Sequence, residues 1–122
     1  MARYRLSAPA KADIASLLKR SEELHGREAR VRYRGCLSAA LRRVATDLEG
    51  RSTVDRGQLF PGLRSFHIHH SRYESREVPV VRPVHLIFFR IRQVGIVEIV
   101  RILHERMEPE RHLGLQDVSR GD

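Results

Sequence analysis

Tryptophan is absent from the sequence, cysteine occurs once, and no long apolar run interrupts the polar residues. A single cysteine cannot close an intramolecular disulfide, and the small neighbours of Cys36 favour a buried, apolar role for it. A helix that spans a bilayer needs about 20 consecutive apolar residues, a length that no segment approaches. The first residues also lack the apolar stretch of a secretion signal. These absences argue against a disulfide-stapled secreted protein or a membrane protein, and they predict a cytoplasmic location.

Lysine is nearly absent as well. It accounts for two of the 23 basic residues, and the 15 acidic residues leave a formal net charge of +8. Arginine binds phosphates and carboxylates through paired hydrogen bonds, so this composition favours a polyanion or an acidic protein as partner. The arginines form no dense block, and a coding bias towards arginine in a GC-rich genome accounts for them equally well. Charge alone leaves the partner open.

Apolar spacing predicts two amphipathic helices after a short N-terminal strand at residues 2–7. Ser7 stands at an N-cap position with Pro9 in the first turn, which predicts a helix that ends near Gly26. A second run, from about Glu28 to Leu48, repeats apolar residues at steps of three and four. The connection is short, so the two helices form an antiparallel hairpin whose apolar stripes need a partner layer.

The second half of the chain has the patterns of strands. Segment 63–72 alternates, with Phe66 and Ile68 on one side and histidines on the other. Segments 84–91 and 96–104 are rich in branched and aromatic residues and are joined by a tight turn. Because the connections are short, these three strands are expected to be antiparallel neighbours.

The chain therefore predicts a single α+β domain at residues 1–122. An N-terminal strand and an antiparallel helical hairpin pack on a small antiparallel sheet. Residues 71–83 are polar and carry two prolines, which predicts an extended loop. Residues 109–122 are expected to form a short helix or a loose C-terminal tail. The hairpin covers one face of the sheet, so the opposite face is expected to be available for function.

Two histidines, His67 and His69, are predicted on one strand and therefore on one face. Two imidazoles at this spacing suit a metal ion, but a stable site needs further ligands. The sequence offers neither a cysteine pair nor an HExxH motif, and His85 joins them only in a favourable register. No metal and no cofactor are therefore expected. The histidines are interpreted as polar residues on a partly solvated strand face.

Some charged residues have purely structural interpretations. Glu98 interrupts the apolar pattern of the last strand and is expected to pair with Arg90 or Arg92 on the neighbouring strand. Arg64 has one such interpretation too, in which it anchors a turn to a carboxylate.

Three stretches of the chain resemble the ParE branch of the RelE/ParE toxin superfamily. They are YRLSAPAKADIASLL near the start, GLRSF at the second predicted strand, and VEIVRILHERME at the last one. The likeness covers about residues 4–108, and the order of elements matches. Members are toxins of bacterial toxin–antitoxin pairs, so the resemblance implies a RelE/ParE-like fold. It also implies a hetero-oligomer with a ParD-like antitoxin, acidic and partly disordered, that folds as it binds.

ParE-like members are described as inhibitors of DNA gyrase. The resemblance therefore implies gyrase as the target and a toxin that acts by binding, with no catalytic residue. The candidate target-binding residues are Arg64, His67, His69 and Arg106. A degenerate toxin that binds its antitoxin but poisons nothing is a further alternative.

RelE-like members cut mRNA on the ribosome, which gives an enzymatic alternative. Cleavage through the 2′-hydroxyl needs a base, a proton donor and positive charge at the phosphate. By resemblance to the RNase branch, Arg64 would anchor the phosphate, His104 would act as acid or base, and Arg106 would clamp the transition state. Against this, the Leu-His pair is also common in ParE-like toxins. The basic cluster of RNase members is sparse in this sequence, and their C-terminal aromatic residue is missing from it.

Overall fold

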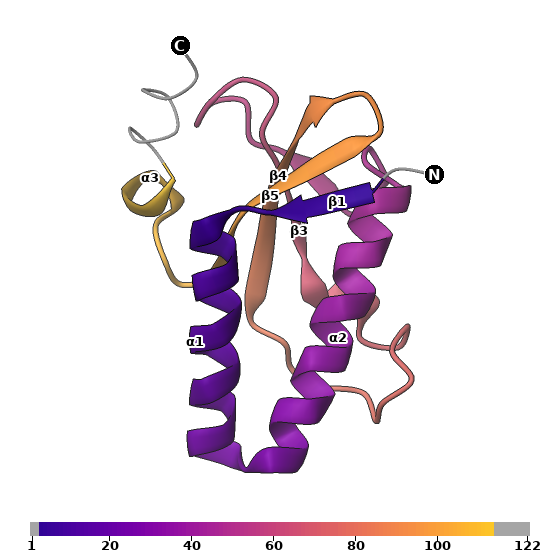
Figure 1. The fold of residues 1–122 in the computed structure, drawn as a ribbon, viewed down its shortest axis with the longest axis vertical. Helices are drawn as coiled ribbons and strands as arrows, with labels where there is room; N and C mark the ends of the chain where they lie inside the picture. The colour runs from indigo at the N-terminus through magenta and orange to yellow at the C-terminus, as the bar shows by residue number, and fades with distance from the viewer. Residues whose placement is uncertain (1–2, 114–122) are drawn as a thin grey trace.

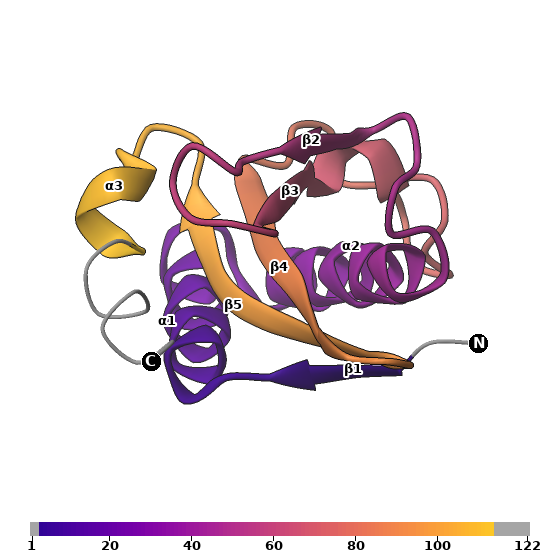
Figure 2. The same cartoon turned by 90° about the horizontal axis from the view of Figure 1, so that it is seen from above.

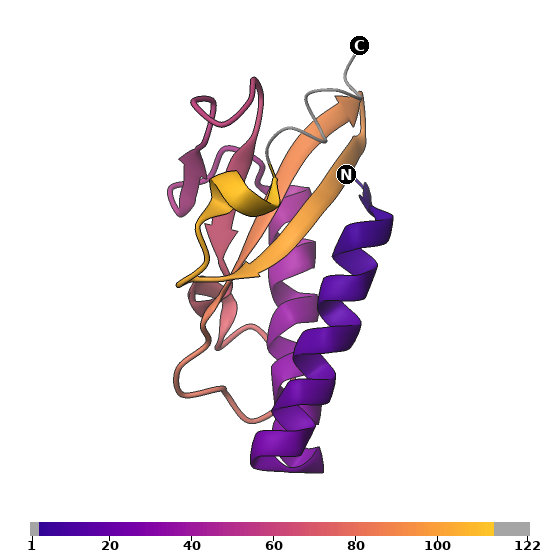
Figure 3. The ribbon, with the colours of Figure 1, turned by 90° about the vertical axis from the view of Figure 1, so that its left-hand side faces the viewer.

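A computed structural model describes residues 3–113 of the chain. In chain order the elements are β1 (Arg3–Leu6), α1 (Ala8–His25), α2 (Arg27–Thr46), β2 (Thr53–Asp55), β3 (Arg64–His67), the 3-10 helix η1 (Ile68–Ser71), β4 (His85–Gln93), β5 (Ile96–His104) and α3 (Pro109–His112) (Figure 1). The helical hairpin lies on one side of a five-stranded sheet, and α3 lies on the other (Figure 3). This confirms the predicted α+β class. The last part of the expected tail, residues 114–122, lies outside the described residues.

Both predicted helices are present. The hydroxyl of Ser7 accepts the backbone N–H of Ala10 at 3.1 Å and caps α1. Gly26 separates the helices with a φ of 95°, a conformation that costs glycine little and other residues much. The second helix ends at Thr46 rather than Leu48. No helix in the described part of the chain is both long and apolar enough to cross a membrane.

The sheet contains more than the predicted antiparallel meander. Its strand order is β1-β5-β4-β3-β2, with β1 and β2 at opposite edges (Figure 2). The N-terminal strand pairs in parallel with β5, from Arg3 opposite Ile96 to Leu6 opposite Ile99. Strand β2 has three residues, which is too short for an alternating apolar pattern to predict it from the sequence. Periodicity shows that a segment is a strand but not which strand lies beside it, so the mixed sheet was not predicted.

The strand predicted at residues 63–72 is wrong in its second half. Strand β3 stops at His67, and the chain turns into η1. The side chain of His67 accepts the backbone N–H of His69 at 3.1 Å, which caps this turn. The pairing of β3 with β4 runs from Arg64 opposite Phe89 to His67 opposite Leu86, where it stops. His67 and His69 therefore do not share a strand face.

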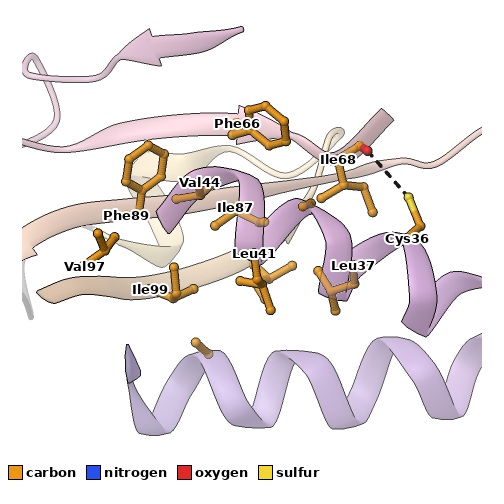
Figure 4. Packing of buried hydrophobic residues seen from close by; sticks show 13 residues of the cluster. Cys36, Leu37, Leu41, Val44, Phe66, Ile68, Ile87, Phe89, Val97 and Ile99 are labelled. Atoms are coloured by element: carbon orange, nitrogen blue, oxygen red, sulfur yellow. Dashed lines mark hydrogen bonds between the residues drawn. The ribbon is translucent and has the colours of Figure 1, made fainter. Parts of the chain in front are cut away.

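The main core lies between the helices and the sheet. Side chains of α2 point towards the strands and pack against apolar side chains of the sheet (Figure 4). The thiol of Cys36 donates to the carbonyl of Ile68 at 3.5 Å, and burial raises the pKa of this thiol to about 11. The cysteine is 1% exposed, which confirms its predicted buried role. The buried members of this core are Ala10, Cys36, Leu37, Ala40, Leu41, Val44, Phe66, Ile68, Ile87, Phe89, Val97, Ile99 and Ile102.

A second, smaller core occupies the opposite face of the sheet. Residues that precede β3 and the end of α3 bring apolar side chains over this face. The expectation that this face is open is therefore wrong for the part that they cover. Its buried members are Phe60, Leu63, Phe88, Val100, Leu103 and Leu113.

Beyond the end of β1, the first residues of α1 lie along the edge of β5 and form hydrogen bonds to its backbone. The hydroxyl of Ser7 donates to the carbonyl of Val100 at 2.8 Å. The carboxylate of Asp13 accepts the backbone N–H of Ile102 at 2.9 Å. The same carboxylate binds the guanidinium of Arg101 through two hydrogen bonds of 2.8 and 2.9 Å. Side-chain groups of the helix thus complete the hydrogen bonding of a strand that has lost its neighbour.

Candidate functional site

The three residues of the enzymatic alternative are only partly brought together. In the sheet, His104 lies opposite His85, whereas Arg64 lies opposite Phe89. His85 and Phe89 are four residues apart along β4, a distance of about 13 Å at the usual rise of a strand. Arg106 follows His104 closely, and its backbone N–H donates to His104 Nδ1 at 3.1 Å. A phosphate bound at Arg64 would therefore lie far from the imidazole of His104.

Arg64 has a different partner from the expected carboxylate. Its Nη2 donates to the hydroxyl of Thr53 at 2.8 Å and so ties β3 to β2. The expected cross-strand pair is present: Arg90 binds Glu98 directly opposite at 2.8 Å. Both arginines thus take part in sheet contacts.

His67 and His69 meet at a small depression of about 360 Å³ beyond the end of β3. Their ring centroids are 4.6 Å apart. His67 Nε2 lies 2.8 Å from one carboxylate oxygen of Glu105, and Arg82 donates to the other at 3.0 Å. The hydrogen bond from His67, followed by the charge of Arg82, lowers the pKa of Glu105. Burial and the neighbouring imidazoles lower the pKa of His69. Two candidate target-binding residues are therefore joined through a shared polar cluster.

A larger cleft of about 670 Å³ opens at the same end of the sheet. The turn between α1 and α2 and the loop before β4 both lie at this end of the molecule (Figure 1). The cleft has the size of common ligand and peptide-anchor sites. Its lining residues are Leu17, Arg20, Ser21, Leu24, His25, Ala29, Arg32, Tyr33, Pro79, Val80, Val81, Arg82, Val84, His85 and His104.

The lining combines apolar walls with basic groups. Leu24 and Val81 on its wall are 59% and 94% exposed, so the wall offers apolar area that a partner could bury. Three arginines and three histidines stand among the described lining residues, and no aspartate or glutamate does. The cleft therefore suits a molecule that carries apolar groups together with negative charge.

Tyr33, His85 and His104 form the polar floor of the cleft. The hydroxyl of Tyr33 accepts the backbone N–H of Val84 at 3.0 Å and lies 2.5 Å from His85 Nδ1. The rings of His85 and His104 meet edge to face, with centroids 5.4 Å apart. Burial, and then the neighbouring imidazoles, lower the pKa of His85 to about 4, and burial raises the pKa of Tyr33. His85 is therefore neutral at pH 7, with Tyr33 as its donor.

Of these three residues, only His104 was predicted from the sequence as a site residue, and His85 was considered only as a possible metal ligand. His104 was a candidate, but Tyr33 lies in the apolar stripe of α2 and His85 at the start of an apolar strand. A tyrosine within a helical apolar stripe is a usable signal, because a buried hydroxyl needs a hydrogen-bond partner. Its partner is 52 positions further along the chain, and only the fold reveals it.

Replacing Tyr33 with phenylalanine is expected to lower the free energy of unfolding by about 1–2 kcal/mol. The change leaves the ring in place but removes the acceptor of the Val84 N–H and the donor to His85. Chemical denaturation followed by circular dichroism measures the loss. The matched control is Tyr73→Phe, because Tyr73 is 73% exposed, and its effect is expected within about 0.5 kcal/mol. Equal effects of the two changes would contradict the assigned network.

No group of three histidine, cysteine, aspartate or glutamate side chains within residues 3–113 is placed to hold a metal ion. The imidazoles of His67, His85 and His104 instead bind carboxylate, hydroxyl and backbone groups.

Comparison with known proteins places these features in context. A family model described as the ParE toxin of the type II toxin–antitoxin system, parDE, matches residues 4–109. A solved structure described as the chromosomal ParDE TA system from P. aeruginosa is similar in fold, with a TM-score of 0.55 and 18% identity. The similarity covers 85% of this chain and 96% of that one. No curated protein matches the sequence.

Proposed function

Because the chain belongs to the ParE toxin family of type II toxin–antitoxin systems, we propose that it arrests bacterial growth by binding DNA gyrase and that a cognate antitoxin neutralises it. The observation that carries this proposal is the family match, which spans residues 4–109. The fold is consistent with it, since the similar solved structure comes from a ParDE system. The toxin and its antitoxin would act in the cytoplasm as a hetero-oligomer.

The large cleft is the proposed antitoxin surface. Its exposed apolar wall, at Leu24 and Val81, offers area that a partner would bury. The basic groups around it favour an acidic segment, and the net charge of +8 attracts such a segment over longer distances. A segment that is disordered alone would order as it enters the cleft.

The proposed target surface lies beside the cleft. His67 and His69 meet at the smaller depression, and Arg106 follows Glu105, the residue that binds His67. Arg64 lies at the other end of β3, so it would contact a different part of a large target. These four residues act by binding in this proposal and require no metal or cofactor.

Induced expression in a bacterium without antitoxin tests the target. We expect filamentation with DNA damage and loss of colony formation. A resistance mutation in gyrase should relieve these effects, and His104→Ala should leave them unchanged, because a binding toxin needs no acid or base. The integrity of DNA and of mRNA is followed in the same cultures. Circular dichroism establishes that each variant is folded.

Two other results would contradict the gyrase proposal. Rapid mRNA fragmentation that disappears in His104→Ala would identify an endonuclease, whose acid–base residues would then be sought around His104 and His85. A folded chain that leaves growth, DNA and mRNA intact would identify a degenerate toxin that retains antitoxin binding alone.

A further inference from the structure

We propose that the floor of the cleft, formed by Tyr33, His85 and His104, is a binding site for one carboxylate of the antitoxin segment. The inference rests on the proposed function and deepens it, because it names the chemical group that the cleft recognises. Apolar side chains of the segment would lie along the wall of the cleft. One aspartate or glutamate between them would reach the floor.

The hydrogen bonds at Nδ1 determine which ring nitrogen carries the proton in His85 and in His104. The hydroxyl of Tyr33 accepts the N–H of Val84, and among the described residues the acceptor within its reach is His85 Nδ1, which therefore receives the hydroxyl proton. His104 Nδ1 likewise accepts the backbone N–H of Arg106. In a neutral imidazole with Nδ1 as acceptor, the proton sits on Nε2. Both rings therefore direct an Nε2–H donor away from the groups that hold Nδ1.

These two donors are open to a ligand. Within the described part of the chain, neither Nε2 atom has a hydrogen-bond partner. Neither atom is among the fully buried polar atoms that lack a partner, so solvent can reach both. Both histidines line the cleft, and their ring centroids are 5.4 Å apart. Two adjacent N–H donors suit the two oxygens of a carboxylate.

The chain's own nearby carboxylates are already engaged elsewhere. Asp13 and Glu105 are the acidic residues that act electrostatically on His85. The first binds Arg101 through both of its oxygens. The second is shared between His67 and Arg82. Within residues 3–113, neither of these two carboxylates is therefore left to accept a hydrogen bond from the floor.

The walls of the cleft decide which kind of anion fits. Single-stranded nucleic acid usually binds where aromatic rings stack on its bases. Apart from Tyr33 and the histidines, the lining has no aromatic residue, and its walls are leucine, valine and proline. Arg20, Arg32 and Arg82 also line the cleft and add positive charge. This combination fits an acidic amphipathic peptide better than RNA.

Titration calorimetry with paired variants tests the site. The probe is the acidic protein encoded by the neighbouring gene, as wild type and as a series in which single aspartates or glutamates become amides. The toxin is used as wild type, His85→Ala and His104→Ala, because glutamine would keep an N–H donor in place of Nε2–H. We expect one amide variant to bind wild-type toxin on the order of tenfold more weakly and to lose much less against His104→Ala, as interacting pairs do in double-mutant cycles.

The control is His112→Gln, because the exposed side chain of His112 lies on α3 and not in the cleft. It should bind every antitoxin variant as wild-type toxin does. Thermal unfolding of each toxin variant tests whether a loss of binding comes from unfolding of the variant.

The remaining outcomes separate the two proposals. No binding by wild-type toxin would overturn the antitoxin proposal itself. Tight binding without a carboxylate that couples to His85 or His104 would overturn the floor site and leave the antitoxin proposal standing. A single-stranded RNA oligonucleotide is titrated in parallel. Binding of that RNA that depends on His104 would also overturn the carboxylate site.

Discussion

Replacement of Asp13 by alanine is expected to lower the free energy of unfolding by about 3 kcal/mol, within the range observed when one partner of a poorly solvated ion pair is removed. The carboxylate accepts three hydrogen bonds, two from Arg101 and one from the backbone of Ile102. The two side chains are only 15% and 22% exposed, so water replaces the lost bonds poorly. The change would also leave the Ile102 N–H without its acceptor, because the pairing of β1 with β5 ends at Ile99.

Denaturant unfolding of the purified chain measures this effect. The control is Glu108→Ala, which removes an ion pair with Arg111 whose side chains are 63% and 76% exposed. Exposed pairs contribute little, so its effect is expected to stay below about 1 kcal/mol. If Asp13→Ala costs no more than this control, the carboxylate does not hold α1 to β5 as described.

Acid is expected to weaken the fold before most carboxylates titrate. The folded pKa of His85 is about 4, whereas an unfolded histidine titrates near 6.5. Between these values the unfolded chain binds more protons, so stability is complete above about pH 6.5 and is lost as the pH falls towards 4. The difference corresponds to about 2–3 kcal/mol at the lower limit, after some reduction for the partial exposure of the ring.

Other groups act in the same direction. Burial lowers the pKa values of His69 and His70, so they also favour the unfolded state below about pH 6.5. The pKa of Glu105 is lowered as well, and its contribution is lost only at still lower pH. Around His85, the imidazoles of His104 and His67 oppose its protonation, whereas Asp13 and Glu105 favour it.

Urea unfolding at a series of pH values between 4 and 7 tests this prediction. His85→Gln does not titrate, and its amide oxygen can still accept the Tyr33 hydroxyl. The pH dependence should therefore be much flatter in this variant. His112→Gln, at an exposed position, should keep the slope of the wild type. A slope that survives in His85→Gln would assign the acid sensitivity to other groups.

Sequence periodicity predicted the helices and the long strands because each of them buries one regular face. The stripe of α2 and the apolar runs of β4 and β5 are local patterns, and they lie where they were expected. Pairing partners are not local. The parallel contact of β1 with β5, and the turn that ends β3 at His67, depend on which strands stop where.

The candidate site was predictable only in part, for a similar reason. His104 was identified through the resemblance of one short stretch, and His67 and His69 through their spacing. Tyr33 and His85 take part because a helix near the start and a strand near the end of the chain meet at one hydrogen bond. Side-chain partners separated this far leave no pattern in the sequence between them.

The closure of the β5 edge by the start of the chain has a consequence for biosynthesis. Ser7 bonds to Val100, 93 positions later, and Asp13 to Ile102, 89 positions later. Contacts between such distant positions carry a large loop-closure entropy cost and slow folding. A nascent chain on the ribosome has no native neighbour for β1 until β5 has emerged, and His104, which lines the cleft, is the last residue of β5. The cleft therefore cannot form before all of β5 has been synthesised and has left the ribosome, and an antitoxin made beforehand would already be present when the folded toxin first appears.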